Sequence, residues 1–137
     1  MMKRILWGVL GVVVVACVGW QSLRMAKNQL DTKVLAFHSA ADDLIQGLQQ
    51  YKEFIGSYPP GNNLDIAKAL SGQTEKKVLI LVARKASRNQ QGELVDPWGT
   101  PIQFYLSGNS VLIRSAGPNK VWEDSSVLGS DDLFRSN

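Results

Sequence analysis

The sequence predicts an α+β protein in which a long N-terminal α-helix packs on a small antiparallel β-sheet. Two observations carry this prediction. No proline occurs before Pro59, so an apolar segment and the amphipathic segment after it are predicted to form one uninterrupted helix. Two short strand-like runs near the C-terminus are separated by a tight turn, which is typical of a hairpin. At 137 residues the chain holds one domain with a modest core.

The first segment of the chain is apolar enough to predict a membrane-crossing helix. From Ile5 to Leu23 there are 19 consecutive uncharged residues, and a helix of that length extends roughly 28 Å, close to the thickness of a bilayer hydrocarbon core. Trp7 and Trp20 stand near its two ends, where indole rings favour the membrane interface. We therefore expect residues 1–24 to be a membrane anchor or signal segment.

The domain expected at residues 25–137 begins with an amphipathic helix. Apolar residues recur at helical spacing from Met25 to Ile55, and Gly56 with the Pro59–Gly61 turn ends the pattern. The predicted apolar stripe consists of Leu30, Val34, Phe37, Ala41, Leu44, Leu48, Tyr51 and Ile55.

The rest of the chain predicts a second helix followed by β-structure. Residues 64–72 have the pattern of a short helix that ends at a glycine. The apolar run at 78–82 fits either a strand or a buried helix. Turn residues at 97–101 (PWGTP) precede strand-like runs at 102–106 and 110–115. The Ser-Gly-Asn connection between these runs predicts an antiparallel hairpin, with Val111 and Ile113 facing a core.

The charge distribution argues against nucleic-acid binding. Four of the 15 basic residues precede residue 30 without any acid among them, so that 11 basic residues face 12 acidic residues in the remainder. The basic excess therefore flanks the apolar segment, where cations contact lipid headgroups. The folded part carries no basic stripe of the kind that binds phosphates.

The sequence does not predict an enzyme. The single histidine, His38, lies beside the apolar stripe, and no nucleotide-binding glycine pattern, G-x-S-x-G motif or Cys/His metal set occurs. Asp96, in DPWG, is better explained as a turn residue that binds its own backbone than as an acid catalyst.

The tail from Gly117 to Asn137 is predicted to be irregular and acidic. Carboxylates along a glycine-containing loop suit a hard cation that prefers oxygen ligands. Asn119, Asp131 and Asp132 are the candidates, with backbone carbonyls near Ser115 completing the shell. The spacing is not that of an EF-hand, and a solvated acidic loop explains the same residues.

Four motifs together resemble a known family. They are Leu48–Tyr51 running into Gly56–Pro59, Asp96–Pro101 (DPWGTP), Ser115–Asn119 (SAGPN), and Asp131–Leu133. In this order they are similar to the major pseudopilin of type II secretion systems and to related type IV pilin-like proteins. The resemblance implies a pilin-like fold and a calcium-binding C-terminal loop. Its implied ligands here are Asn119, Asp131 and Asp132, with the carbonyls of Ile113 and Ser115.

The resemblance also implies a function in protein transport rather than in catalysis. It predicts a structural or assembly subunit in the inner (cytoplasmic) membrane, with one membrane-spanning helix and an extracytoplasmic, periplasmic domain. Expected partners are secretion-system or other envelope proteins and further copies of the chain in an oligomer or filament. The alternative is an anchored or lipidated envelope protein-binding module that uses the same scaffold without polymerising.

The N-terminus departs from the family pattern, and three interpretations of it stay open. None of Gly8, Gly11 and Gly19 is followed by the phenylalanine of a prepilin cleavage site, and the first glutamate in the chain is Glu53. The segment is predicted to be an uncleaved anchor, a lipoprotein signal ending in Val-Val-Ala-Cys with a lipidated Cys17, or a processed prepilin.

Overall fold

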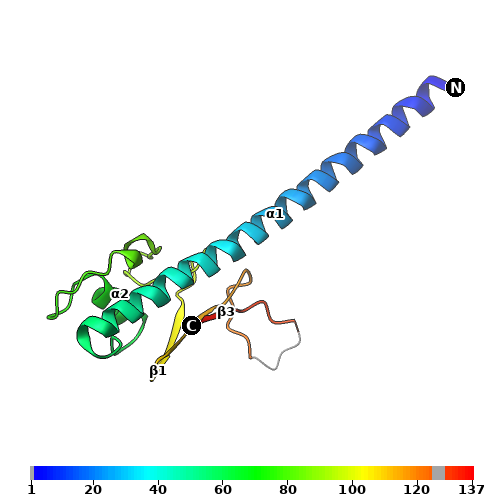
Figure 1. The fold of residues 1–137 in the computed structure, drawn as a ribbon. Coiled ribbons are helices and arrows are strands. Elements are labelled where there is room, and N and C mark those ends of the chain that lie inside the picture. Colours follow the sequence, from blue (N-terminus) through cyan, green and yellow to red (C-terminus); the bar gives the residue numbers. More distant parts are fainter. Residues whose placement is uncertain (1, 125–128) are drawn as a thin grey trace. The chain divides into compact units, whose positions relative to one another are not determined.

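The computed structural model describes the backbone of residues 2–124 and 129–137 and the side chains of residues 20–124 and 129–137. It confirms the predicted α+β class, with a long N-terminal helix and a small antiparallel sheet (Figure 1). The elements in order are α1 (Met2–Ile55), α2 (Asn63–Leu70), the short 3-10 helix η1 (Val82–Lys85), β1 (Gln103–Ser107), β2 (Ser110–Ser115) and β3 (Leu133–Ser136). The chain divides into two units, 1–32 and 33–137.

The prediction of one uninterrupted helix is confirmed by α1. The helix ends where glycine was expected to end it, because Gly56 adopts a φ of 91° and its N–H donates to the carbonyl of Lys52 at 2.7 Å. A left-handed residue just after the last turn is the usual way to bind a free helical carbonyl, and glycine adopts that conformation without steric cost.

The predicted membrane location is corrected by the structure. Among the residues whose side chains it describes, 20–124 and 129–137, no helix is long and apolar enough to cross a membrane. A crossing helix needs about 20 consecutive apolar residues, whereas α1 from residue 20 onward soon carries Arg24, Lys27 and Asp31. The assignment to the inner membrane as a single-pass protein is therefore not retained. The apolar residues 5–19, including Cys17, lie outside the described side chains.

The core of the second unit forms where the apolar stripe of α1 meets the sheet. Leu48 on α1 and Val111 and Ile113 on β2 are each fully buried, which confirms the predicted core face of the hairpin. The buried part of the predicted stripe consists of Phe37, Ala41, Leu44, Leu48 and Tyr51. Leu30 of that stripe is instead 42% exposed. The same cluster of core residues includes Ile66 and Leu70 from α2.

The predicted second helix is confirmed as α2, and its N-terminus is closed by a reciprocal capping box. The Asn62 side chain accepts from the Asp65 N–H at 3.1 Å, while the Asp65 carboxylate accepts from the Asn62 N–H at 3.0 Å. Two of the otherwise free N–H groups of the first turn are thus bound.

The apolar run at 78–82 forms neither a regular strand nor a buried helix. Ile80 is buried in the core and Val78 packs against it. The Ile80 N–H donates to the carbonyl of Leu70 at 2.9 Å. Leu79 and Leu81 on either side are 49% and 65% exposed. Leu79 forms an isolated antiparallel bridge with Ser71. Leu81 already has helical backbone angles, and η1 begins directly after it.

The sheet has the order β1-β2-β3, and both neighbouring pairs are antiparallel. The predicted hairpin is confirmed, with Phe104 opposite Ile113 and Ser107 opposite Ser110. The prediction of an irregular tail is wrong at its end, since β3 adds a strand there with Phe134 opposite Arg114. The four residues of β3 are mostly exposed, so they carry no apolar alternation that marks a strand.

Candidate functional site

The loop from β2 to β3 folds back so that its two ends lie side by side. At its start Gly117 adopts a φ of 67°, and a Cβ placed on Gly117 would overlap the carbonyl oxygen of Asp131. Only glycine allows so close an approach in this conformation. The glycine of the SAGPN motif therefore brings the Asp131-Asp132 pair back against the end of β2.

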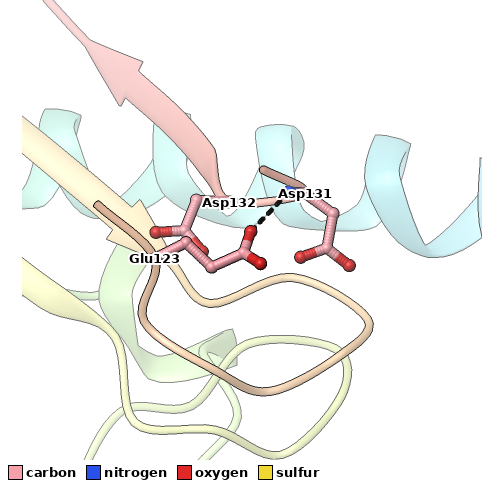
Figure 2. Close-up of side chains that lie close together, drawn as sticks. All are labelled: Glu123, Asp131 and Asp132. Atoms are coloured by element: carbon pink, nitrogen blue, oxygen red, sulfur yellow. Dashed lines mark hydrogen bonds between the residues drawn. The ribbon is translucent and has the colours of Figure 1, made fainter. Parts of the chain in front are cut away.

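This folding gathers carboxylates from both arms of the loop (Figure 2). Glu123, Asp131 and Asp132 each offer an oxygen, and these oxygens lie within 4.8 Å of one another. The Asp131 N–H donates to Glu123 Oε2 at 3.0 Å, which is the dashed contact in Figure 2. The Asn119 N–H donates to Asp131 Oδ2 at 3.2 Å. We call Glu123, Asp131 and Asp132 the carboxylate cluster.

Two oxygens of the carboxylate cluster are buried without a protein donor. These are Oδ1 of Asp131 and Oδ1 of Asp132, which have no hydrogen-bond partner within the described residues. The Asp132 side chain is fully buried. Burying a carboxylate oxygen without a partner is costly, and such atoms in folded proteins call for water or a cation. The cluster therefore fits an oxygen-coordinated divalent cation such as Ca²⁺.

Arg114 on β2 compensates part of the charge of the cluster. Its Nε donates to Asp132 Oδ2 at 2.6 Å, and its terminal nitrogen contacts the same carboxylate and the carbonyl of Glu123. Burial lowers the pKa of Arg114, but the hydrogen bond and charge of Asp132, together with Tyr105, outweigh that effect and raise it. Arg114 therefore stays charged, and the cluster of carboxylates keeps a net negative charge.

The predicted ligands are only partly brought together. Asp131 and Asp132 lie in the cluster, whereas Asn119 lies beside it and its Oδ1 accepts from the Val121 N–H at 2.7 Å. The Ser115 side chain points elsewhere, since its Oγ donates to Asp96 Oδ2 at 2.6 Å. Ile113 lies in the central strand, between Phe104 and Arg135. For the carbonyls of Ile113 and Ser115, the ligand function stays a prediction.

Sequence reasoning missed Glu123 and Arg114. Nothing in the local sequence distinguishes Glu123 from the neighbouring Asp124, because only the return of the chain at Asp131 selects one of them. Arg114 carries a weak signal, as it is a charged residue at an outward position of a strand whose other face is buried.

The structure confirms that Asp96 is a turn residue. Its Oδ1 accepts from the N–H groups of Trp98 at 3.0 Å and Thr100 at 2.8 Å. Its Oδ2 accepts from Ser115, whose Oγ in turn accepts from the Gly117 N–H at 3.0 Å. Asp96 is 4% exposed, so its oxygens are used to join the DPWG turn to the end of β2.

A hollow in the second unit is separate from the cluster. It is a cavity of about 670 Å³ between the end of α1, α2 and the loop after α2, with Tyr51 and Tyr58 in its wall and Lys68 and Glu75 at its edge. Ser57 and Thr74, each with a hydroxyl group, also line it.

Comparisons with family models, with curated proteins and with solved structures each found no match to this chain.

Proposed function

We propose that this chain is a non-catalytic assembly subunit of the pilin-like, pseudopilin type. It associates with further copies of itself through the part of α1 that belongs to the first unit of the chain. The observation that carries the proposal is a row of large apolar side chains that the chain leaves uncovered. Trp20, Leu23 and Leu30 are 64%, 74% and 42% exposed. The four sequence motifs that resemble pseudopilins support the same assignment.

The exposed side chains have the spacing of a helix-packing face. Leu23 and Leu30 are separated by seven residues, close to two helical turns, and Trp20 lies one turn before Leu23. Fully burying a side chain of this size contributes roughly 1.5–3 kcal/mol. A face of this kind favours association with a second helix, in which apolar ridges fit between those of the partner.

Charges on the same stretch limit how two copies can be arranged. Arg24, Lys27 and Lys33 accompany a single acid, Asp31, and Lys27 lies between Leu23 and Leu30 at helical spacing. We therefore expect a stagger that places Asp31 of one copy beside a basic residue of the next. The Arg24 guanidinium lies 5.5 Å from the centroid of the Trp20 ring, which keeps the charge beside the apolar face without covering Leu23 or Leu30.

Disulfide cross-linking tests this assembly surface. In a Cys17→Ser background, Leu23→Cys and Leu30→Cys should give dimers or longer ladders under mild oxidation. The matched controls are Gln21→Cys and Asn28→Cys, which are also exposed and seven residues apart but lie on the opposite side of the helix. A chain that stays monomeric, or equal cross-linking on both faces, would contradict assembly through this face. A stable monomer would leave the alternative of a single binding module.

The proposal includes Ca²⁺ binding by the carboxylate cluster. A ligand that binds only the native state stabilises it by mass action, by about 2.7 kcal/mol at a concentration 100 times its Kd. The melting temperature of the full chain should therefore rise by several degrees when Ca²⁺ replaces a chelator. Asp131→Asn should abolish the rise, whereas Glu75→Gln, an exposed acid outside the cluster, should retain it. Equal melting temperatures with Ca²⁺ and with chelator would refute the cation site.

A further inference from the structure

We infer that Arg114 is a positioning residue that supplies a built-in positive charge to the carboxylate cluster and keeps the loop between β2 and β3 folded when no metal is bound. The inference rests on the proposed Ca²⁺ site, because it concerns what the chain itself adds to that site. It predicts that residues 117–124 and 129–132 of the native chain are ordered with or without Ca²⁺, and that loss of the guanidinium makes their order depend on the metal.

The contacts of Arg114 join both arms of the loop to the sheet. The residue lies at an outward position of β2, opposite Gln103 on β1 and Phe134 on β3. Its guanidinium contacts the carbonyl of Glu123 on one arm and the carboxylate of Asp132 on the other. A single planar cation with several N–H donors is suited to such a bridge.

Aromatic rings enclose the same guanidinium. Its central carbon lies 5.2 Å from the centroid of the Trp122 ring and 5.4 Å from that of Phe134. The side chain of Arg114 is 17% exposed and that of Asp132 is fully buried. Rings at these distances attract the cation and shield its contact with Asp132 from water. The ion pair is thus much less screened than one on an open surface.

Arg114 and a metal ion use different oxygens of the same carboxylate. The guanidinium binds Oδ2 of Asp132, while Oδ1 of Asp132 and Oδ1 of Asp131 are buried and unpartnered among the described residues. The arginine therefore leaves these two oxygens free to coordinate a cation. Without it, three mutually repelling carboxylates would be held together only by backbone N–H donors, and the loop would open unless a cation were present.

Hydrogen exchange of the full chain, read by mass spectrometry, tests the inference. The measured segments are residues 117–124 and 129–132, peptide by peptide, in Ca²⁺ and in chelator. In the native chain the loop should already be protected in chelator, and Ca²⁺ should slow its exchange further because the ion binds only the closed loop. In Arg114→Gln the loop should exchange about tenfold faster or more in chelator, and Ca²⁺ should restore protection, because removal of one partner leaves a buried charge unpaired.

The matched control removes an arginine from the neighbouring strand. Arg135 binds Asp42 on α1 through its Nε at 2.5 Å and a terminal nitrogen at 2.9 Å, away from the cluster. Arg135→Gln should leave loop exchange unchanged in both conditions. Peptides around Leu48 report whether each variant is folded. If Arg114→Gln does not fold, Arg114→Lys, which keeps the charge but loses the fork, should show the same metal dependence in smaller degree.

The outcomes separate this inference from the proposed Ca²⁺ site. A native loop that is protected only with Ca²⁺, or an Arg114→Gln loop as protected in chelator as the native one, overturns the inference and leaves the Ca²⁺ site standing. Fast exchange of Arg114→Gln in chelator that Ca²⁺ does not slow, with no effect of Ca²⁺ on the native chain, supports the arginine contact and refutes the Ca²⁺ site.

Discussion

Replacing Asp96 by alanine removes the acceptor that joins the DPWG turn to the end of β2. The Asp96 carboxylate accepts from the N–H groups of Trp98 and Thr100 and from the hydroxyl of Ser115. Ser115 is fully buried, so water does not readily replace the lost contact. This turn leads directly into β1. If the turn loosens, the hairpin should therefore pack less tightly against the core.

The magnitude follows from the number and burial of these bonds. A hydrogen bond to a charged group contributes about 1.5–3 kcal/mol, and a buried donor left unpaired costs about 1–3 kcal/mol. The two backbone N–H groups are only partly buried, so water recovers part of the loss. We expect Asp96→Ala to lower the free energy of unfolding by about 2–4 kcal/mol in total.

Urea denaturation followed by circular dichroism measures this change. The slope of the free energy against urea should stay constant, because the surface exposed on unfolding is unchanged. Ser115→Ala should cost about 2 kcal/mol, and the double variant should cost less than the sum, because both residues share one bond. The control is Glu75→Ala, an exposed acid. If Asp96→Ala lies within about 0.5 kcal/mol of this control, the buried network contributes nothing and the reasoning fails.

Two further substitutions test the loop and the core. Gly117→Ala should lower the melting temperature and remove the response to Ca²⁺. Residue 117 has a φ of 67°, and its added Cβ would overlap the carbonyl of Asp131. An unchanged melting temperature would contradict this prediction. Leu48→Ala, at a fully buried position, should cost about 2–5 kcal/mol in urea denaturation. The matched Leu35→Ala on the same helix, 70% exposed, should cost less than about 0.5 kcal/mol, and equal losses would place the core elsewhere.

Local chemistry determined most of the secondary structure. The long helix follows from the absence of proline and from the apolar period, and Gly56 ends it as glycine is expected to. The short connection of the hairpin is likewise a property of neighbouring residues. Each of these patterns is complete within a few residues of sequence, so no distant contact was needed to predict it.

Elements that depend on distant residues were missed or misjudged. β3 is recognisable only beside β2, because pairing with Arg114 and Ile113 organises a segment that has no apolar alternation of its own. The run at 78–82 was ambiguous because its length and composition suit several structures. Its structure depends on distant contacts, the bridge of Leu79 with Ser71 and the burial of Ile80 in the core. The membrane location was inferred from one apolar run, and no described helix supports it.

The candidate site divides in the same way. The sequence by itself determined that Asp131 and Asp132 stand together on an irregular acidic tail after a glycine turn. Only the tertiary structure decided that Glu123 joins them and that Arg114 neutralises part of their charge. The physical reason is that a cation site depends on distances between oxygens, and these distances are set where a loop returns to a strand. The order of residues along the chain does not show where the loop folds back onto β2.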